Sequence, residues 1–385
     1  MDFSYPAEAE AFRREFRAWL EAHLSEEVLQ AGGQPTPDDD AFEVLRRWNA
    51  TMADAGYGAI AWPEEFGGRG AGVMEQVVFA EEMSRLDAPG TVNVLGVANI
   101  APAIIAFGTE DQKRRFLPRM LRADDVWCQG MSEPDAGSDL AALRCRAERD
   151  GDHFVVNGQK TWNTLGHRAN WCELFVRTDA DAPKHKGISC LLVDMTVPGV
   201  EVRPLTTITG DRDFNEVFLD DVRVPVDALL GPMNDGWRVA TTTLSHERAG
   251  VARLHLGVRK KVSRLFDLAR DTPYGEGRAI DDPVLRQSLA RVYVEAEYLK
   301  LLADRAISAE LHGRSAGAES SVAKLAWTEV ENHIAEVAGQ VLGADGLTGR
   351  WGTARVSVRA LSIAGGTTQI NKNVIAQRIL GLPRA

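Results

Sequence analysis

The sequence predicts an α+β fold in three parts: an N-terminal α-helical domain over residues 1–124, a central β-barrel domain over 125–233, and a C-terminal four-helix bundle over 234–385. Two changes in hydrophobic periodicity support this division. Apolar residues recur at helical spacing, then alternate with a period of two, and then return to helical spacing. Regularly spaced turn signals in the middle part favour a compact barrel or sandwich.

The first domain is predicted from apolar stripes and from helix-end signals. The carboxylates at 38–40 and Gly56 mark the start and the end of one helix. The capping box that begins at Thr109 starts another helix, which runs to about Leu121. Further helices are expected over 77–86 and 99–107. The apolar stripes of the first two helices consist of Phe12, Phe16, Trp19, Leu20 and Leu24, and of Phe42, Leu45, Trp48 and Met52.

The middle and last domains follow from the same signals. Hairpin turns are expected at 149–152 and at Asn157-Gly158. The last domain should be a bundle of long helices that could also form a subunit interface. Strands are expected over 153–156, 171–177, 187–193, 200–205 and 216–224. Helices are expected over 237–269, 283–311 and 320–342, with two shorter helices flanking Gly365-Gly366 and the last ending at Gly381.

A loop over residues 129–139 carries the strongest local signal. Pro134 and Gly137 exclude a helix interior, and the segment also holds two hydroxyls and three carboxylates. Turn amides of this kind can form a site for anionic groups. An ordinary acidic surface turn is the alternative interpretation.

Composition limits the possible functions. A net charge of −11 without a basic run argues against nucleic acid as a partner. The four cysteines lie far apart without metal-ligand spacing, which is typical of free thiols in a reducing cytoplasm, so no metal site is expected. Neither a signal peptide nor a membrane span is visible, so we expect a cytoplasmic protein.

Five motifs in order resemble the acyl-CoA dehydrogenase family over the whole chain. They read Trp-Pro-Glu-Glu-Phe-Gly-Gly at 62–68, Phe-Gly-Thr-Glu-Asp-Gln-Lys at 107–113, Met-Ser-Glu-Pro-Asp-Ala-Gly-Ser-Asp at 131–139, Asn-Gly-Gln-Lys-Thr-Trp-Asn-Thr at 157–164, and Gly-Thr-Thr-Gln-Ile at 366–370. The resemblance implies FAD, an acyl-CoA thioester substrate, an electron-transfer flavoprotein as electron acceptor, and a tetramer.

The resemblance also implies roles for individual residues. Ser132 and Thr164 would hydrogen-bond the flavin ring, and Trp162 would pack against it. Ser138 would lie near both the FAD pyrophosphate and the thioester chain. The remaining residues expected at the cofactor are Gln129, Met131, Arg270, Gln340, Gly343, Thr367 and Gln369.

The reaction implied by the resemblance introduces a trans α,β double bond, with a proton leaving Cα and a hydride passing to flavin N5. A thioester α-proton is weakly acidic, so a base and donors to the carbonyl oxygen are needed. Many relatives have the catalytic glutamate at the position of Gly365, which here can supply only a backbone N–H. Glu247 resembles the base that isovaleryl-CoA and long-chain dehydrogenases carry on the preceding long helix. Arg248 would then orient or tune it, and His246 would lie near the substrate. The alternative is a solvated helix glutamate.

Some positions depart from the family pattern. Relatives usually carry Arg-x-x-Phe-Gly where this chain reads Asp-Thr-Pro-Tyr-Gly at 271–275, with Arg270 one place early. Asn163 replaces a common isoleucine. These departures affect the part of the FAD site that subunits share, and they are compatible with either a homotetramer or a heterotetramer with a related subunit. A flavin monooxygenase or oxidase and a non-catalytic partner subunit remain alternative functions.

Overall fold

The computed structural model describes residues 5–34, 36–249, 254–314 and 317–383, but not the side chains of 245–249. It divides into two compact units, Met1–His246 and Glu247–Ala385, and the boundary falls within helix α7 (Gly236–Ala249). The helical, sheet-rich and helical order predicted from periodicity is confirmed. The predicted domain limits near residues 124 and 233 stay predictions.

The chain begins with helices, most of which the apolar stripes predicted. The Thr109 cap is confirmed: its hydroxyl accepts from the Gln112 amide at 3.2 Å, and the Gln112 side chain accepts from the Thr109 amide at 3.0 Å. Helix α2, capped by Ser25, was not predicted. The helices are α1 (Ala7–His23), α2 (Glu26–Gly32), α3 (Asp39–Asp54), α4 (Val73–Arg85), α5 (Ala101–Phe107) and α6 (Glu110–Leu121).

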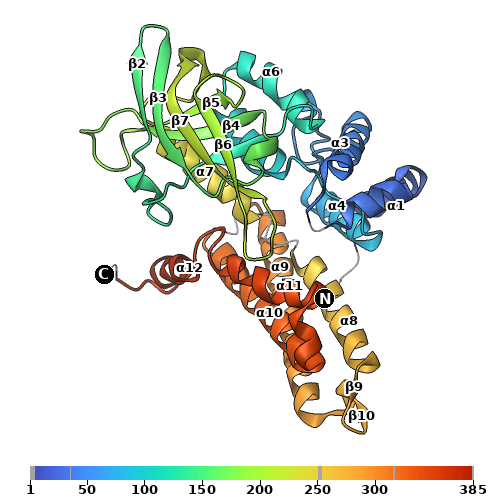
Figure 1. Cartoon of the computed structure of the whole chain (residues 1–385). Helices are drawn as coiled ribbons and strands as arrows, with labels where there is room; N and C mark the ends of the chain where they lie inside the picture. The colour runs from blue at the N-terminus through green and yellow to red at the C-terminus, as the bar shows by residue number, and fades with distance from the viewer. Residues whose placement is uncertain (1–4, 35, 250–253, 315–316, 384–385) are drawn as a thin grey trace. The chain divides into compact units, whose positions relative to one another are not determined.

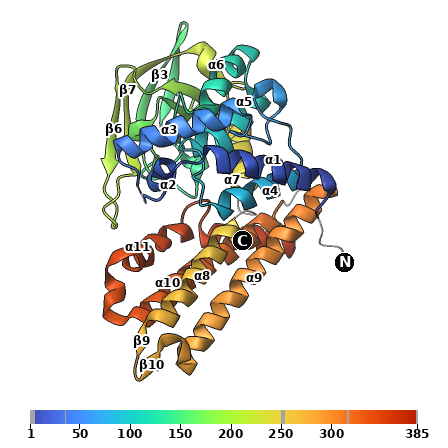
Figure 2. The ribbon, with the colours of Figure 1, turned by 90° about the vertical axis from the view of Figure 1, so that its right-hand side faces the viewer.

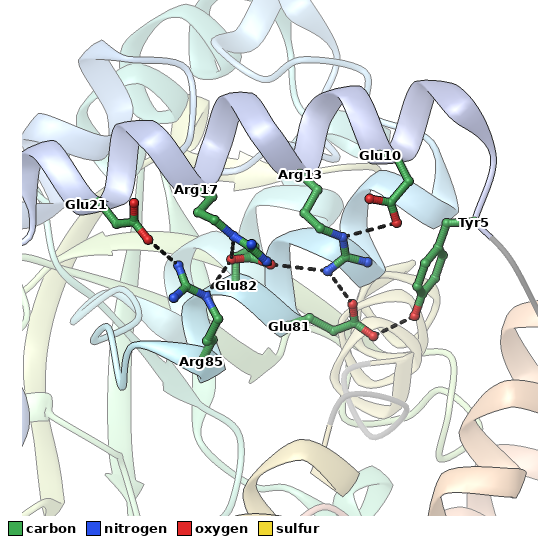
Figure 3. A network of polar contacts seen from close by, with 8 residues as sticks. All are labelled: Tyr5, Glu10, Arg13, Arg17, Glu21, Glu81, Glu82 and Arg85. Atoms are coloured by element: carbon green, nitrogen blue, oxygen red, sulfur yellow. Dashed lines mark hydrogen bonds and ion pairs between the residues drawn. The ribbon is translucent and has the colours of Figure 1, made fainter.

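A polar network joins α1 to α4 (Figure 3). The carboxylate of Glu82 on α4 is 1% exposed and accepts hydrogen bonds from Arg13 at 3.2 Å, Arg17 at 2.7 Å and Arg85 at 2.8 Å. Burial alone would raise the pKa of Glu82, but the three guanidinium groups lower it to about 2. Each arginine therefore offsets part of the cost of burying this charge.

The strands form one eight-stranded sheet with the order β6-β7-β3-β2-β4-β5-β8, and β1 pairs in parallel with β4 (Figure 1). The path ends at β6 and at β8. The strands are β1 (Trp127–Gly130), β2 (Arg146–Asp150), β3 (His153–Lys160), β4 (Trp171–Arg177), β5 (Ile188–Asp194), β6 (Val200–Leu205), β7 (Phe214–Pro225) and β8 (Leu229–Leu230).

One predicted hairpin turn is wrong. Asn157-Gly158 lies inside β3, where the register with β7 shifts at a β-bulge. Gly158 has a φ of 151°, and a Cβ there would lie 2.7 Å from the Cα of Cys145. The glycine is required for close strand packing rather than for a turn. The turn at 149–152 is confirmed between β2 and β3.

One face of the sheet packs against α5, α6 and α7. Its core contains Trp127 of β1, Phe175 of β4 and Leu192 of β5, together with Val239 and Ala240 of α7. Alternating strand residues fill a second core on the other face. The beginning of α7 is thus anchored on β1, β4 and β5.

The second unit is helical, and α8, α9 and α10 run side by side in it (Figure 2). The predicted stripe on α9 is confirmed, because Leu285, Leu289, Val292, Ala296 and Leu299 are all buried in the core of this unit. The helix predicted over 237–269 corresponds to α7 and α8, and residues 250–253 between them lie outside the described part. The elements are α8 (Leu254–Asp271), β9 (Pro273–Tyr274), β10 (Gly277–Arg278), α9 (Pro283–Leu311), α10 (Glu319–Leu342), α11 (Gly349–Ser357) and α12 (Thr368–Val374).

Among the described residues, we find no helix that is both long enough and apolar enough to cross a membrane.

Candidate functional site

Two segments that are far apart in sequence lie side by side at the end of β1. The Thr161 amide donates to the carbonyl of Ser132 at 2.9 Å, and the Asn163 side chain donates to the carbonyl of Gln129 at 2.7 Å. Gln129, Met131 and Ser132 are thereby brought beside the turn that holds Trp162 and Thr164. Five of the residues predicted to bind the cofactor thus come from two adjoining segments of the first unit.

A buried ion pair shapes the loop over 131–139. Lys160 is fully buried, and its ammonium group donates to Glu133 at 2.8 Å and to the carbonyl of Met131 at 3.2 Å. Glu133, 8% exposed, also accepts from the backbone amides of Arg144 at 2.6 Å and Cys145 at 2.9 Å. The donors to the Glu133 carboxylate are two backbone amides and the buried Lys160 ammonium group. These charge-assisted hydrogen bonds hold the start of the loop in place.

The Trp162 turn is strained and exposed. Trp162 has a φ of 61°, which is costly for a bulky residue, yet its side chain is 60% exposed and contacts the Phe214 ring edge-on at 5.8 Å between centroids. Asn215 fixes the turn through two hydrogen bonds with the Asn163 backbone, at 3.0 Å and 2.8 Å. Such strain, maintained by surrounding bonds, is common at functional sites.

The far end of the loop is tied to the β4–β5 connection. Ser138 is exposed, and the neighbouring Asp139 forms an ion pair with Lys184. Arg177 supports both segments, since it donates to the carbonyls of Ala141 at 2.7 Å and Lys184 at 3.0 Å. Sequence reasoning did not single out Lys184, because its partner lies 45 positions away.

The arrangement fits a flat, aromatic, polar cofactor. An exposed indole, Ser132, Thr164 and a turn-rich loop lie in the two segments that follow β1 and β3. Asn163 adds an unusual feature, because its buried side-chain oxygen has no hydrogen-bond partner within the described structure. The donor set and the aromatic surface match what a flavin ring requires.

The other predicted cofactor residues lie in the second unit. Thr367 caps α12, and its hydroxyl accepts from the Ile370 amide at 3.1 Å. Gly343 adopts a φ of 59° at the end of α10. Gln340 and Gln369 are exposed, and Gly365 has a φ of 65° before the start of α12. Their predicted roles at FAD are not tested by the structure.

Arg270 is exposed near the end of α8, where it pairs with Asp267 at 2.8 Å one turn earlier. The residues that follow it form the short β9–β10 hairpin. The proposal that Arg270 replaces the usual FAD-phosphate arginine therefore requires this surface ion pair to open, which costs little.

The three residues predicted to act on the substrate, His246, Glu247 and Arg248, belong to helix α7. Their side chains lie outside the described residues, so their roles stay predictions. The helical backbone at these positions agrees with the predicted location of the base on the first long helix after the sheet.

Comparison with known proteins gives matches along the whole chain. Residues 6–124, 128–222 and 234–380 match the family models for the N-terminal, middle and C-terminal domains of acyl-CoA dehydrogenase. The chain is 41% identical to acyl-CoA dehydrogenase IpdE1 of Mycobacterium tuberculosis, with 98% of each chain covered. It is 36% identical to acyl-CoA dehydrogenase FadE26 of the same organism, with both chains fully covered.

Solved structures agree with these matches. The ChsE4-ChsE5 complex from Mycobacterium tuberculosis contains a chain with a TM-score of 0.85 and 35% identity, and all of both chains is covered. A protein described as the Tcur3481-Tcur3483 steroid ACAD gives a TM-score of 0.86 and 31% identity, again with full coverage of both chains.

Proposed function

The chain belongs to the acyl-CoA dehydrogenase family, and on that premise we propose that it is an FAD-dependent enzyme that introduces a trans α,β double bond into an acyl-CoA thioester. The observation that carries the proposal is the pairing of the 129–133 segment with the 160–164 turn. That pairing brings the segment that contains Ser132 beside the turn that contains the exposed, strained Trp162, and a flavin ring would bind there.

When bound, FAD would supply the hydride acceptor. The protein's own residues would hold it, with Ser132 and Thr164 as hydrogen-bond partners and Trp162 as a packing surface. Ser138 would lie near the pyrophosphate and the thioester chain. Gln129 and Met131 belong to the same segment as Ser132 and would also contact FAD. The remaining FAD contacts would come from residues of the second unit: Arg270, Gln340, Gly343, Thr367 and Gln369.

The proton step would depend on Glu247. Its carboxylate would remove the α-proton, while the Gly365 N–H would donate to the thioester carbonyl oxygen and stabilise the developing charge. Contact with an apolar acyl chain would raise the pKa of the carboxyl group toward working pH. Arg248 would orient the carboxylate, and His246 would contact the substrate. Gly365 itself carries no proton acceptor, which is why the base must come from elsewhere.

The relatives suggest which acyl groups to test first. One similar structure is described as a steroid ACAD, so we place steroid-derived thioesters at the head of the substrate panel. Another is a complex of two chains, which favours a heterotetramer with a related subunit over a homotetramer. An electron-transfer flavoprotein would reoxidise the enzyme, and we expect it to work in the cytoplasm.

The test is anaerobic bleaching of flavin absorbance by short, branched, long-chain and steroid-derived acyl-CoAs. We expect Glu247→Gln to keep FAD but to lose most turnover, at least about a hundredfold, because the α-proton then has no acceptor. Glu310→Gln, an exposed glutamate of α9, is the matched control and should behave as wild type. Full turnover by Glu247→Gln would exclude Glu247 as the base.

A non-catalytic partner subunit is the second candidate function, and the observation that favours it is Gly365, which leaves the usual position of the base without a carboxylate. In that case the purified chain would bind little FAD and show no bleaching with any thioester, whereas a catalytic partner would gain stability from its presence. Fast reaction of the reduced flavin with O₂ would instead indicate an oxidase or monooxygenase.

A further inference from the structure

A fully buried carboxyl group lies between the sheet and α7. Glu173 of β4 is 0% exposed and shares its sheet face with Phe175, opposite Leu192 of β5. Val239 and Ala240 of α7 close the same apolar layer. Burying a carboxyl group here is costly, so its partners decide what it can do.

Both oxygens of Glu173 have a hydrogen-bond donor. The Thr243 hydroxyl of α7 donates to one oxygen at 2.8 Å, and the Gln129 side-chain amide of β1 donates to the other at 3.2 Å. Thr243 is itself fully buried. Within the described part of the chain, neither a lysine, an arginine nor a histidine pairs with this carboxyl group. Among the described residues, it therefore links α7 and β1 through neutral donors.

These contacts continue to the Trp162 turn. The carbonyl of Gln129 accepts from the Asn163 side chain at 2.7 Å, and the Asn163 carbonyl accepts from Asn215 at 2.8 Å. Buried and half-buried hydrogen bonds thus connect α7, through Glu173 and Gln129, to Asn163, the residue after Trp162.

We propose that Glu173 is a positioning residue for the dehydrogenase reaction: it fixes α7 at Thr243, one helical turn before Glu247, against the strand that leads into the flavin-binding loop. The inference rests on the proposed function, because the position of α7 matters for the reaction only if Glu247 on this helix is the base. Glu173 is too buried to touch substrate, so it acts through Thr243 and Gln129. A fixed helix matters because even a small displacement of the catalytic base lowers the reaction rate many-fold.

Glu173 acts electrostatically on two buried thiols of the sheet, Cys172 on β4 and Cys190 on β5. The pKa of Cys172 is raised by its hydrogen bond with Cys128 and by burial, and burial together with the charge of Glu173 raises the pKa of Cys190. Both thiols stay neutral at working pH. Among the described side chains of α7 and β1, Thr243 and Gln129 donate to the carboxyl group.

The experiment compares the holoenzyme with Glu173→Leu, Thr243→Val and their double variant. Glu173→Leu suits the apolar layer and Thr243→Val keeps the side-chain shape, so both should fold. We expect each to lower kcat about tenfold with KM changed less than about twofold, and the double variant to lose no more than either single one. Thr241→Val is the control, because the Thr241 hydroxyl is exposed and bonds within its own helix at 2.9 Å.

Two further readouts separate positioning from general stability. Amide hydrogen exchange over 236–244, measured without substrate, should quicken in Glu173→Leu and Thr243→Val but not in Thr241→Val. Glu173→Gln retains hydrogen-bonding capacity, so it should keep most of the wild-type turnover, unlike Glu173→Leu.

Wild-type kcat and exchange in Glu173→Leu, additive losses in the double variant, or a loss of turnover in Glu173→Gln as large as in Glu173→Leu would each overturn the proposal. If the wild type oxidises no thioester, the proposed function fails. The exchange measurement then still decides whether Glu173 fixes α7.

Discussion

At the scale of single residues, Glu173 shows how burial sets the behaviour of a carboxyl group. Burial raises the pKa of Glu173 to about 7, and the hydrogen bonds from Thr243 and Gln129 only partly counteract it. A group whose pKa is raised on folding is most favourable to the folded state while protonated. Its contribution to stability is therefore lost as the pH rises from about 4.5 to about 7.

Glu173→Gln should consequently stabilise the protein more at high pH than at low pH. The advantage of the variant over wild type in the free energy of unfolding should grow by on the order of 1 kcal/mol between pH 6 and pH 9, because folded wild type carries the buried charge only at the higher pH. Urea unfolding at both pH values measures it. A constant difference would mean that Glu173 has the same charge throughout this range.

At the scale of elements, the docking of α1 on α4 depends on Glu82. Its pKa is lowered to about 2, so its contribution to stability is complete above about pH 4.5 and is lost as the pH falls through about 2. Glu82→Gln should lower the free energy of unfolding by about 3 kcal/mol at pH 7, because three arginines lose their shared charged partner. The effect should shrink toward pH 3, and denaturant unfolding at the two pH values would measure both quantities.

The matched control is Glu21→Gln in the same network. Glu21 accepts from Arg85 at 2.8 Å, but its side chain is 53% exposed, so its loss should cost less than about 1 kcal/mol. If Glu82→Gln and Glu21→Gln lowered the free energy of unfolding equally, burial would not explain the contribution of Glu82.

Elements were predictable where one local pattern decides the structure. The Thr109 cap and the α9 stripe were correct for that reason. The Asn157-Gly158 turn was wrong because Gly158 serves a contact with Cys145, which no local pattern reveals. In the candidate site, motifs identified the loop and the Trp162 turn. They could not identify Glu173, because its importance comes from partners 44 and 70 positions away.

At the scale of the whole molecule, helix α9 has two apolar faces, and the described residues bury one of them. Val294, Tyr298 and Leu301 form a second stripe at helical spacing and are 49%, 62% and 60% exposed. A helix that is apolar on opposite faces is normally covered on both. We therefore expect a related or identical subunit to cover this outer stripe in the proposed tetramer.

Tyr298→Glu/Leu301→Glu should reduce the sedimentation coefficient of the assembly to that of a smaller species, because two charges would have to be buried in the contact. Analytical ultracentrifugation with the FAD-to-chain ratio measures this, with and without a co-expressed related subunit. Val284→Glu is the control: Val284 is 73% exposed on the first turn of α9, well before Val294, where the outer stripe begins. One FAD per chain in a wild-type homotetramer would exclude the heterotetramer. An unchanged tetramer in the double variant would show that the outer stripe is not a subunit contact.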